Sequence, residues 1–382
     1  MVGPLAGLRV IEIAGIGPAP FAAMVLADLG AEVIRVDRPG GRGLPVDSVY
    51  DLLNRGKRAI VVDLKHPQGA VLIGELAAKA DALVEGFRPG VAERLGIGPA
   101  ALREVNPKLV YGRMTGWGQH GPLAGTAGHD LTYLAISGVL HAIGPAGGPP
   151  VPPLNLLGDY GGGGMLLAVG VLGALWHAAR TGQGQVVDAA IVDGAALLAT
   201  QVYGMLHAGA WRDSRAANLL DGGAPQYGVY ETSDGKYLAV GPLEPKFYAE
   251  FAARLGGLGE APDPYDVTAW AELRRLIAAR LATRTQAEWL DVFAGSDACV
   301  APVLSLTEAP VHPHLAARQT FVEIDGVRQP APAPRFSVTP LGLPTPPAWP
   351  GEHTREVLAD WGISGFDELL ATGVIHATTP PG

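Results

Sequence analysis

The chain has 382 residues, of which 48% are hydrophobic and 17% charged, so it can bury one or two large cores. Its formal charge of −9, without any basic block, excludes a typical nucleic-acid-binding protein. The single cysteine, Cys299, excludes a disulfide framework and a thiolate metal cluster.

The first half of the chain alternates short apolar runs with amphipathic stretches. Strands are predicted at 8–13, 31–37, 59–64, 82–85, 109–114 and 185–192, and helices at 21–29, 69–79, 91–95, 165–180 and 193–208. Strands that alternate with helices predict a parallel sheet covered by helices, an α/β fold of the Rossmann-like type.

Composition changes near residue 211, and a second, smaller α+β domain is predicted. It contains a strand at 237–240 and amphipathic helices at 247–255, 269–282 and 285–293. We therefore expect a large domain (1–190 plus 336–382), a linker helix (191–216), a small domain (217–305) and a return linker (306–335). A last helix at 352–361 is expected to pack on the large domain.

No membrane or metal partner is expected. The apolar run from Met165 to Trp176 stops at about twelve residues, short of the roughly 18 that a membrane span needs. The N-terminus has no basic region ahead of an apolar one, and the chain contains no HxxxH or HExxH pattern. These features predict a soluble, cytoplasmic protein.

The loop after the first strand invites a dinucleotide-binding interpretation. Residues 15–20 read Gly-Ile-Gly-Pro-Ala-Pro, and Asp37 ends the second strand. Pro20 replaces the third glycine of that motif, and Pro18 and Pro20 lack the N–H groups that would hold a pyrophosphate. A Rossmann-like sheet that binds no NAD is therefore favoured.

Cationic side chains gather near the predicted strand ends in an otherwise acidic protein. They are Arg38, Arg55, Lys57, Arg58, Lys65, Arg88 and Arg94. In open α/β sheets, ligands bind at the carboxyl ends of the strands. Each of these side chains alone is typical of a solvated surface, but together they predict an anionic, phosphate-bearing ligand.

The stretch from 128 to 164 contains the candidate catalytic groups. His129 follows a glycine, and Asp159 precedes the glycine run 161–164. Histidine is a base near neutral pH, and burial lets an Asp hold a proton there. The glycine run predicts a turn whose N–H groups can close on a developing oxyanion. The position of Glu244 in the sequence, taken alone, predicts an acidic residue near the N-terminus of a helix.

These residues lie within motifs that resemble the family III CoA-transferases, and within that family the α-methylacyl-CoA racemases. The resemblance runs nearly end to end. Its motifs are Asp63-Leu64-Lys65, Glu85 to Gly90, Thr115 to Gln119, Gly128-His129-Asp130, Gly158-Asp159, Asp297 to Val303 and Gly351 to Thr354.

The resemblance implies a Rossmann-like large domain, a small domain and an obligate, interlocked homodimer. It also implies that the large domain binds the CoA part of the substrate and that no further cofactor is required. The residues implied to contact CoA or the thioester are Arg38, Val62, Asp63, Leu64, Lys65, Gly86, Phe87, Arg88, Arg94, Gly128, Asp130, Leu131, Thr132 and Tyr133.

By the same resemblance the enzyme is an isomerase that interconverts the R and S forms of 2-methylacyl-CoA thioesters. His129 and Asp159 would exchange the α-proton from opposite faces through an enolate. Glu244 from the partner subunit would orient His129, Asn155 would support Asp159, and Gly161 and Gly162 would supply donors. A CoA-transferase that acylates Asp159 is the alternative, and a catalytically idle CoA-binding protein a third.

Overall fold

The computed structural model describes residues 2–41, 46–258 and 261–378, which form two compact units. Unit 1 comprises Met1–Ser137, Leu154–Leu198 and Arg318–Gly382, and unit 2 comprises Gly138–Pro153 and Ala199–Ala317. Residues 138–153, which the sequence analysis assigned to the large domain, group with unit 2. The physical reason is Arg215, whose guanidinium donates to the carbonyls of His141 and Gly148, each at 2.8 Å.

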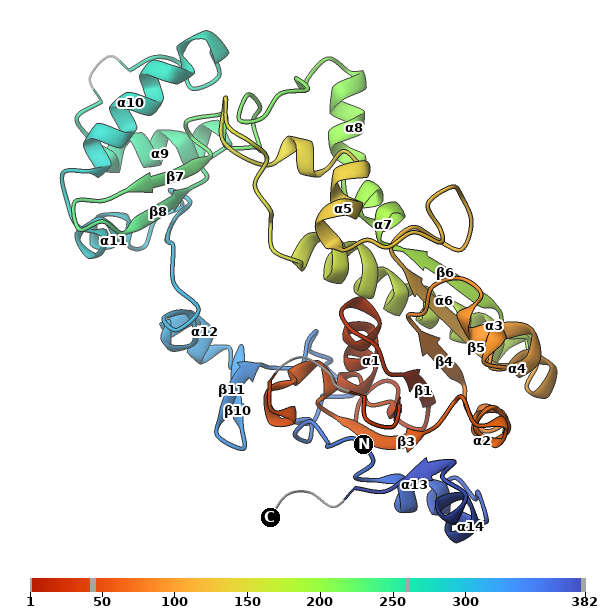
Figure 1. The fold of residues 1–382 in the computed structure, drawn as a ribbon. Helices are drawn as coiled ribbons and strands as arrows, with labels where there is room; N and C mark the ends of the chain where they lie inside the picture. The colour runs from red at the N-terminus through yellow and green to blue at the C-terminus, as the bar shows by residue number, and fades with distance from the viewer. Residues whose placement is uncertain (1, 42–45, 259–260, 379–382) are drawn as a thin grey trace. The chain divides into compact units, whose positions relative to one another are not determined.

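Unit 1 is built on a seven-stranded sheet with the order β12-β3-β2-β1-β4-β5-β6 (Figure 1). Six strands are parallel, and the short β12 is antiparallel to β3. Their bounds are β1 Arg9–Ile13, β2 Glu32–Asp37, β3 Lys57–Val62, β4 Ala82–Glu85, β5 Val110–Thr115, β6 Val186–Ala190 and β12 Ile375–His376. The order of the parallel strands is that of a doubly wound Rossmann-like sheet, which confirms the predicted α/β architecture.

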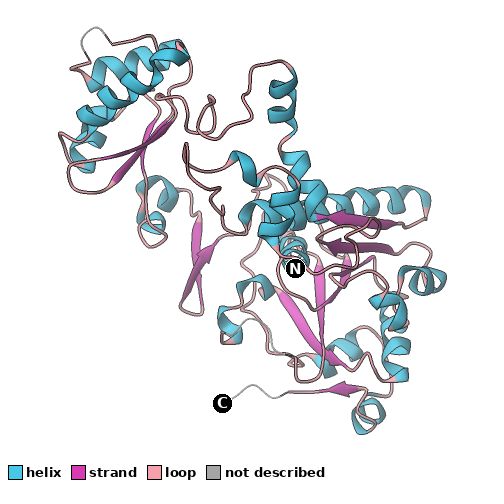
Figure 2. Ribbon diagram, turned by 45° about the horizontal axis from the view of Figure 1, so that its top comes forward, coloured by secondary structure: helices cyan, strands magenta, loops and turns pink. Residues whose placement is uncertain are grey.

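Helices cover both faces of this sheet (Figure 2). On one face, α1 (Pro18–Asp28) and α6 (Leu166–Thr181) pack their small and apolar side chains against β1, β4 and β5. On the other face lie α2 (Pro67–Ala77), α4 (Pro99–Val105) and α13 (Thr354–Asp360), the last burying Trp361 just beyond its end. The remaining helices of unit 1 are α3 Val91–Arg94, α5 Asp130–Ile136, α7 Ile191–Leu198 and α14 Phe366–Ala371.

The glycine run 161–164 lies in a helix and not in the predicted turn. Leu156–Met165 forms a π-helix, labelled η4, that continues into α6. Gly162 and Gly164 are buried because they lie against backbone: a Cβ would approach within 2.7 Å of Ala195 N at the first position and of Pro18 O at the second. The missing side chains let η4 pack closely on α7 and α1.

The combined helix Leu156–Thr181 is longer than the apolar run expected from sequence, because it begins at Leu156 and not at Met165. Within the described ranges it is the one helix long and apolar enough to cross a membrane by length and composition, a test that core helices of soluble proteins also pass. Leu167 and Val171 on this helix have no exposed surface and belong to the core of unit 1.

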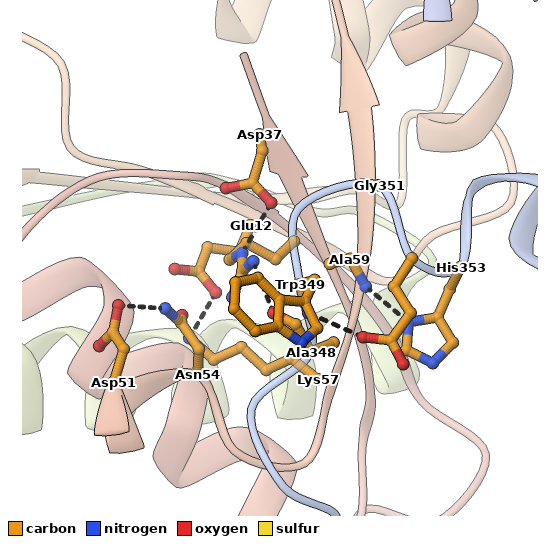
Figure 3. Close-up of polar contacts among 12 residues, drawn as sticks. Glu12, Asp37, Asp51, Asn54, Lys57, Ala59, Ala348, Trp349, Gly351 and His353 are labelled. Atoms are coloured by element: carbon orange, nitrogen blue, oxygen red, sulfur yellow. Dashed lines mark hydrogen bonds and ion pairs between the residues drawn. The ribbon is translucent and has the colours of Figure 1, made fainter. Parts of the chain in front are cut away.

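The C-terminal part of unit 1 completes the sheet edge. His353 and Ala59 of β3 exchange two hydrogen bonds: His353 N donates to Ala59 O at 2.9 Å, and Ala59 N donates to His353 Nδ1 at 3.3 Å (Figure 3). Val357 and Trp361 enter the core, so α13 packs on unit 1 as expected. It is not the last helix, because α14 follows it. The hairpin of β10 (Phe321–Ile324) and β11 (Val327–Pro330) precedes this segment.

Unit 2 has a three-stranded antiparallel sheet of β7 (Gly228–Glu231), β8 (Tyr237–Val240) and β9 (Val300–Pro302). Helices α9 (Pro245–Leu255), α10 (Trp270–Leu281) and α11 (Gln286–Phe293) enclose its core around Phe251 and Trp289, confirming the α+β character. The predicted helix at 193–208 is divided into α7 in unit 1 and α8 (Thr200–His207) in unit 2, which also contains α12 (Pro313–Ala317).

Candidate active site

His129 and Asp159 line one cavity of unit 1. The cavity has a volume of about 280 Å³ and is also lined by residues 16–19, 86–89, 114–117, 124, 126–128, 133 and 191. His129 is the N-cap residue of α5, whereas Asp159 lies in the first half of η4. The two ionisable groups therefore come from different helices but face a shared space.

Thr132 holds the backbone of His129 at the start of α5. Its hydroxyl accepts a hydrogen bond from His129 N at 3.0 Å and donates to His129 O at 2.7 Å. These two bonds fix the main chain on which the imidazole is carried. The imidazole itself belongs to an exposed residue that lines the cavity, so it is accessible to a ligand there.

The environment of Asp159 favours its protonated form. Burial raises the pKa of the Asp159 carboxyl, and the negative charge of Asp130 raises it further. A hydrogen bond from the Asn155 side chain and the charge of His129 lower the pKa, but the net shift is upward. Asn155 thus contacts Asp159 as the sequence analysis expected, and Asp159 is suited to hold a proton at a pH where an ordinary Asp would not.

Tyr133 forms the wall of this cavity. Its ring is 4.7 Å from that of Trp117 in an edge-on arrangement, and it is almost fully buried. Burial, followed by the charge of Asp159, raises the pKa of the Tyr133 hydroxyl, while Arg88 lowers it. A side chain at Gly116 or Gly128 would overlap the Tyr133 ring, which explains why glycine occupies both positions.

Gly17, which also lines this cavity, is the N-cap residue of α1 and lies next to Asp159. Its backbone has φ 78°, and a Cβ there would lie 3.4 Å from Asp159 Oδ2. This left-handed conformation, favoured by glycine, brings the main chain close to the carboxylate.

A second cavity, of about 320 Å³, adjoins the first. Ile16 and Phe87 line both, so the two cavities are neighbours. Arg38, Leu64 and Phe87 from the predicted CoA-binding set line the second cavity. The sequence analysis missed the polar residues Asp51 and Asn54 there, because no local pattern reveals that this loop turns back toward β2.

The other predicted contact residues fall into two groups, those that line the first cavity and those that line neither cavity. Gly86, Arg88, Gly128 and Tyr133 line the first, whereas neither cavity lining includes Val62, Asp63, Lys65, Arg94, Asp130, Leu131 or Thr132. Asp63 instead accepts the N–H of Lys65 at 2.9 Å, closing the turn after β3.

Three of the clustered cations do not form part of an anion-binding surface, which corrects that expectation. Arg55 binds Asp28 inside the protein, and Lys57 lies 2.6 Å from Glu12. Arg58 bridges Glu32 and Asp360. Their charges are matched by carboxylates distant in sequence, and β3 begins at Lys57, so these residues precede the carboxyl end of that strand.

Glu244 belongs to unit 2, where it is exposed at the N-cap position of α9. Its side chain forms no capping hydrogen bond, so the carboxylate is not used to hold the helix N-terminus. The negative charge of Glu244 raises the pKa of the Tyr265 and Cys299 side chains, although burial raises both pKa values more. Among the residues that the structure describes, no group of three or more His, Cys, Asp or Glu side chains is arranged to hold a metal ion.

Comparison with known proteins gives consistent matches over nearly the whole chain. Residues 5–354 match the model of CoA-transferase family III. An alpha-methylacyl-CoA racemase of Mus musculus is 46% identical over 374 residues, covering 96% of this chain and 95% of the relative. That of Homo sapiens is 44% identical over 366 residues, with 94% of each covered.

More distant relatives include transferases. Succinyl-CoA:glutarate CoA-transferase of Mus musculus is 32% identical over 399 residues, covering 98% of this chain and 90% of the relative. Among solved structures, a CAIB/BAIF family protein from Brucella suis superposes with a TM-score of 0.81 at 27% identity. The match covers 94% of this chain and 100% of the Brucella suis chain.

Proposed function

Since the chain belongs to CoA-transferase family III, we propose that it is an isomerase that interconverts the R and S epimers of 2-methylacyl-CoA thioesters. The observation that carries this proposal is the pairing of His129 with Asp159 around one cavity. The 46% and 44% identity to the alpha-methylacyl-CoA racemases of mouse and human supports the same activity.

Inversion at the α-carbon requires a base on one face of the substrate and an acid on the other. In one direction a base removes the α-proton, and the electron pair of the C–H bond moves onto the thioester oxygen to form an enolate. The acid then returns a proton to the opposite face. His129 and Asp159 exchange these roles in the reverse direction, so the pair carries one proton in both resting forms.

The raised pKa of Asp159 suits this chemistry. A neutral imidazole and a protonated carboxyl form one of the two resting states, and burial stabilises the uncharged carboxyl. The transfer moves only protons, so it needs no cofactor beyond the CoA that the substrate carries.

The adjoining cavities suit one extended ligand. The acyl thioester would lie beside His129 and Asp159. The CoA part of the substrate would extend past Ile16 and Phe87 toward Arg38. A guanidinium is well suited to bind a phosphate of the nucleotide part. The polar wall of the second cavity, with Asp51 and Asn54, would face the same end of the ligand.

We also propose a homodimer in which Glu244 of one chain orients His129 of the other. The carboxylate of Glu244 is exposed and does not cap its own helix, so it is available to a second subunit. Exposed apolar side chains on the helices of unit 1, among them Val169, Trp176 and Leu197, provide surface that association would cover.

Complementation tests the shared site directly. His129→Ala and Glu244→Ala chains are co-expressed with different tags, and the mixed dimer is isolated. If each site combines the two chains, one site of the mixed dimer retains both native side chains, and about half of the wild-type activity returns, whereas each homodimer stays impaired. Absence of recovery in a stable mixed dimer contradicts a shared site.

The reaction itself is tested by incubating one pure epimer of a 2-methylacyl-CoA in D₂O. The proposal predicts the other epimer together with deuterium at the α-carbon. If the protein is instead a transferase, Asp159 attacks the thioester to form a mixed anhydride, CoA ends on an added carboxylic acid while the 2-methyl acid is released, and inversion is absent.

A further inference from the structure

The carboxylate of Asp130 is directed at the backbone of Asp159 and is absent from the lining of the catalytic cavity. Oδ1 of Asp130 accepts a hydrogen bond from the N–H of Asp159 at 2.7 Å. Asp130 is the first residue of α5, directly after His129, and Asp159 lies in η4. One side chain therefore connects the start of α5, which His129 caps, with the residue that supplies the second ionisable group.

The neighbouring backbone leaves space for this contact. A Cβ at Gly158 would collide with Oδ1 of Asp130 and would lie 3.3 Å from the Leu134 side chain. Gly158 is buried, so neither helix can readily shift to accommodate an added carbon atom. The close approach of the Asp130 carboxylate thus depends on glycine at position 158.

We infer that Asp130 is a positioning residue, which fixes the backbone of Asp159 relative to His129 and places a carboxylate beside the pair. This inference rests on the proposed function, because it concerns the same two proton-transferring groups. It assigns Asp130 a role distinct from direct contact with the substrate.

The charge of Asp130 acts on the proton that the pair shares. It is the second largest influence that raises the pKa of Asp159, after burial, and it opposes the effects of Asn155 and His129. Tyr133, whose pKa responds to the Asp159 charge, and Arg88, which acts on Tyr133, line the same cavity as Asp159. Removing this negative charge makes protonation of Asp159 less favourable.

The test is the pH dependence of kcat/KM for epimerisation by wild type, Asp130→Asn and Asp130→Ala. The amide oxygen of asparagine can still accept the Asp159 N–H, so Asp130→Asn removes the charge and retains the hydrogen bond. Its pH profile is expected to move to lower pH, because Asp159 releases its proton more readily without the charge of Asp130. Asp130→Ala also loses the hydrogen bond, and its kcat/KM at the optimum is expected to fall about 10- to 100-fold.

Two further variants separate this role from general stability. Gly158→Ala displaces the Asp130 carboxylate and should lower activity in wild type, yet add little to Asp130→Ala, because both changes remove the same contact. Asp81→Asn is the matched control. Asp81 also accepts a backbone N–H, from Arg9 at 2.8 Å, but Arg9 begins β1, whereas the cavity lies beyond the other end of that strand. Its pH profile should coincide with that of wild type.

A pH profile of Asp130→Asn that overlays wild type overturns the inference, as does full additivity of Gly158→Ala and Asp130→Ala. Deuterium exchange by the wild-type protein is measured alongside. If wild type neither exchanges nor inverts, the proposed function fails, whereas normal wild-type inversion with an unshifted Asp130→Asn profile refutes only the role of Asp130.

Discussion

The ammonium group of Lys57 lies 2.6 Å from a carboxylate oxygen of Glu12, and neither side chain has exposed surface. Lys57 on β3 reaches Glu12 on β1 across β2 (Figure 3). It also donates to Pro20 O at 3.0 Å in the first turn of α1. Burial raises the pKa of Glu12 and lowers that of Lys57, so each group is stabilised mainly by the other.

We predict that Lys57→Met lowers the free energy of unfolding by about 3–5 kcal/mol, because it leaves a buried carboxylate without its counter-charge. The double variant Glu12→Leu/Lys57→Met removes both charges and should recover most of that loss. Urea denaturation of the three proteins measures this. A double variant as unstable as Lys57→Met would show that the charge of Glu12 is not the cause.

The glycine run of η4 gives a prediction about packing. Gly164→Ala should lower stability by about 1–3 kcal/mol, because its Cβ would lie 2.7 Å from both Pro18 O and the Phe21 ring. Gly74→Ala in α2 is the matched control, since no atom lies within 4 Å of the added carbon. That control should be neutral or more stable by about 0.5–1 kcal/mol, as expected for alanine in a helix. Equal thermal midpoints for the two variants would contradict close packing of η4 on α1.

Binding of CoA esters tests the second cavity. Arg38→Ala is expected to raise KM about 10- to 100-fold with kcat nearly unchanged, because a phosphate contact remote from the α-carbon is equally strong in substrate and transition state. Arg58→Ala removes a cation that Glu32 and Asp360 already neutralise, so its KM should remain that of wild type. A fall in kcat at constant KM for Arg38→Ala would exclude this position for the nucleotide.

Asn155 gives a pH prediction opposite in sign to that for Asp130. Its hydrogen bond lowers the pKa of Asp159 in the native protein, so Asn155→Ala should raise that pKa. The kcat/KM profile should then move to higher pH, because Asp159 retains its proton to a higher pH than in wild type. Steady-state rates across the pH range provide the measurement, and a shift to lower pH would be inconsistent with this hydrogen bond.

The parts of the fold that local pattern determines were predictable. Strand β4 was predicted with its observed bounds, and the alternation of strands and helices indicated the parallel sheet. The short strand β12 was not foreseen, because two residues become a strand only when β3 offers an unpaired edge. The glycine run was misread as a turn, since sequence does not show that α1 and α7 require small neighbours there.

The candidate site divides in the same way. His129 and Asp159 were identified from sequence and line a common cavity. Arg55 and Lys57 were misassigned as ligand-binding cations, because their partners Asp28 and Glu12 lie far away in sequence and are brought near only by the fold. The contact between Asp130 and Asp159 likewise depends on how α5 and η4 pack, which no spacing in the sequence encodes.

The most direct test of the central proposal is α-proton exchange in D₂O by wild type, His129→Ala and Asp159→Asn, each with both pure epimers of a 2-methylacyl-CoA. Wild type should exchange and invert both epimers. Each variant should lose inversion and retain slow exchange of one epimer only, and the retained epimer should differ between the variants, because each remaining base faces one side of the α-carbon. Near-normal inversion by either variant, or an acyl group bound covalently to Asp159 while His129→Ala stays active, would contradict the two-base account.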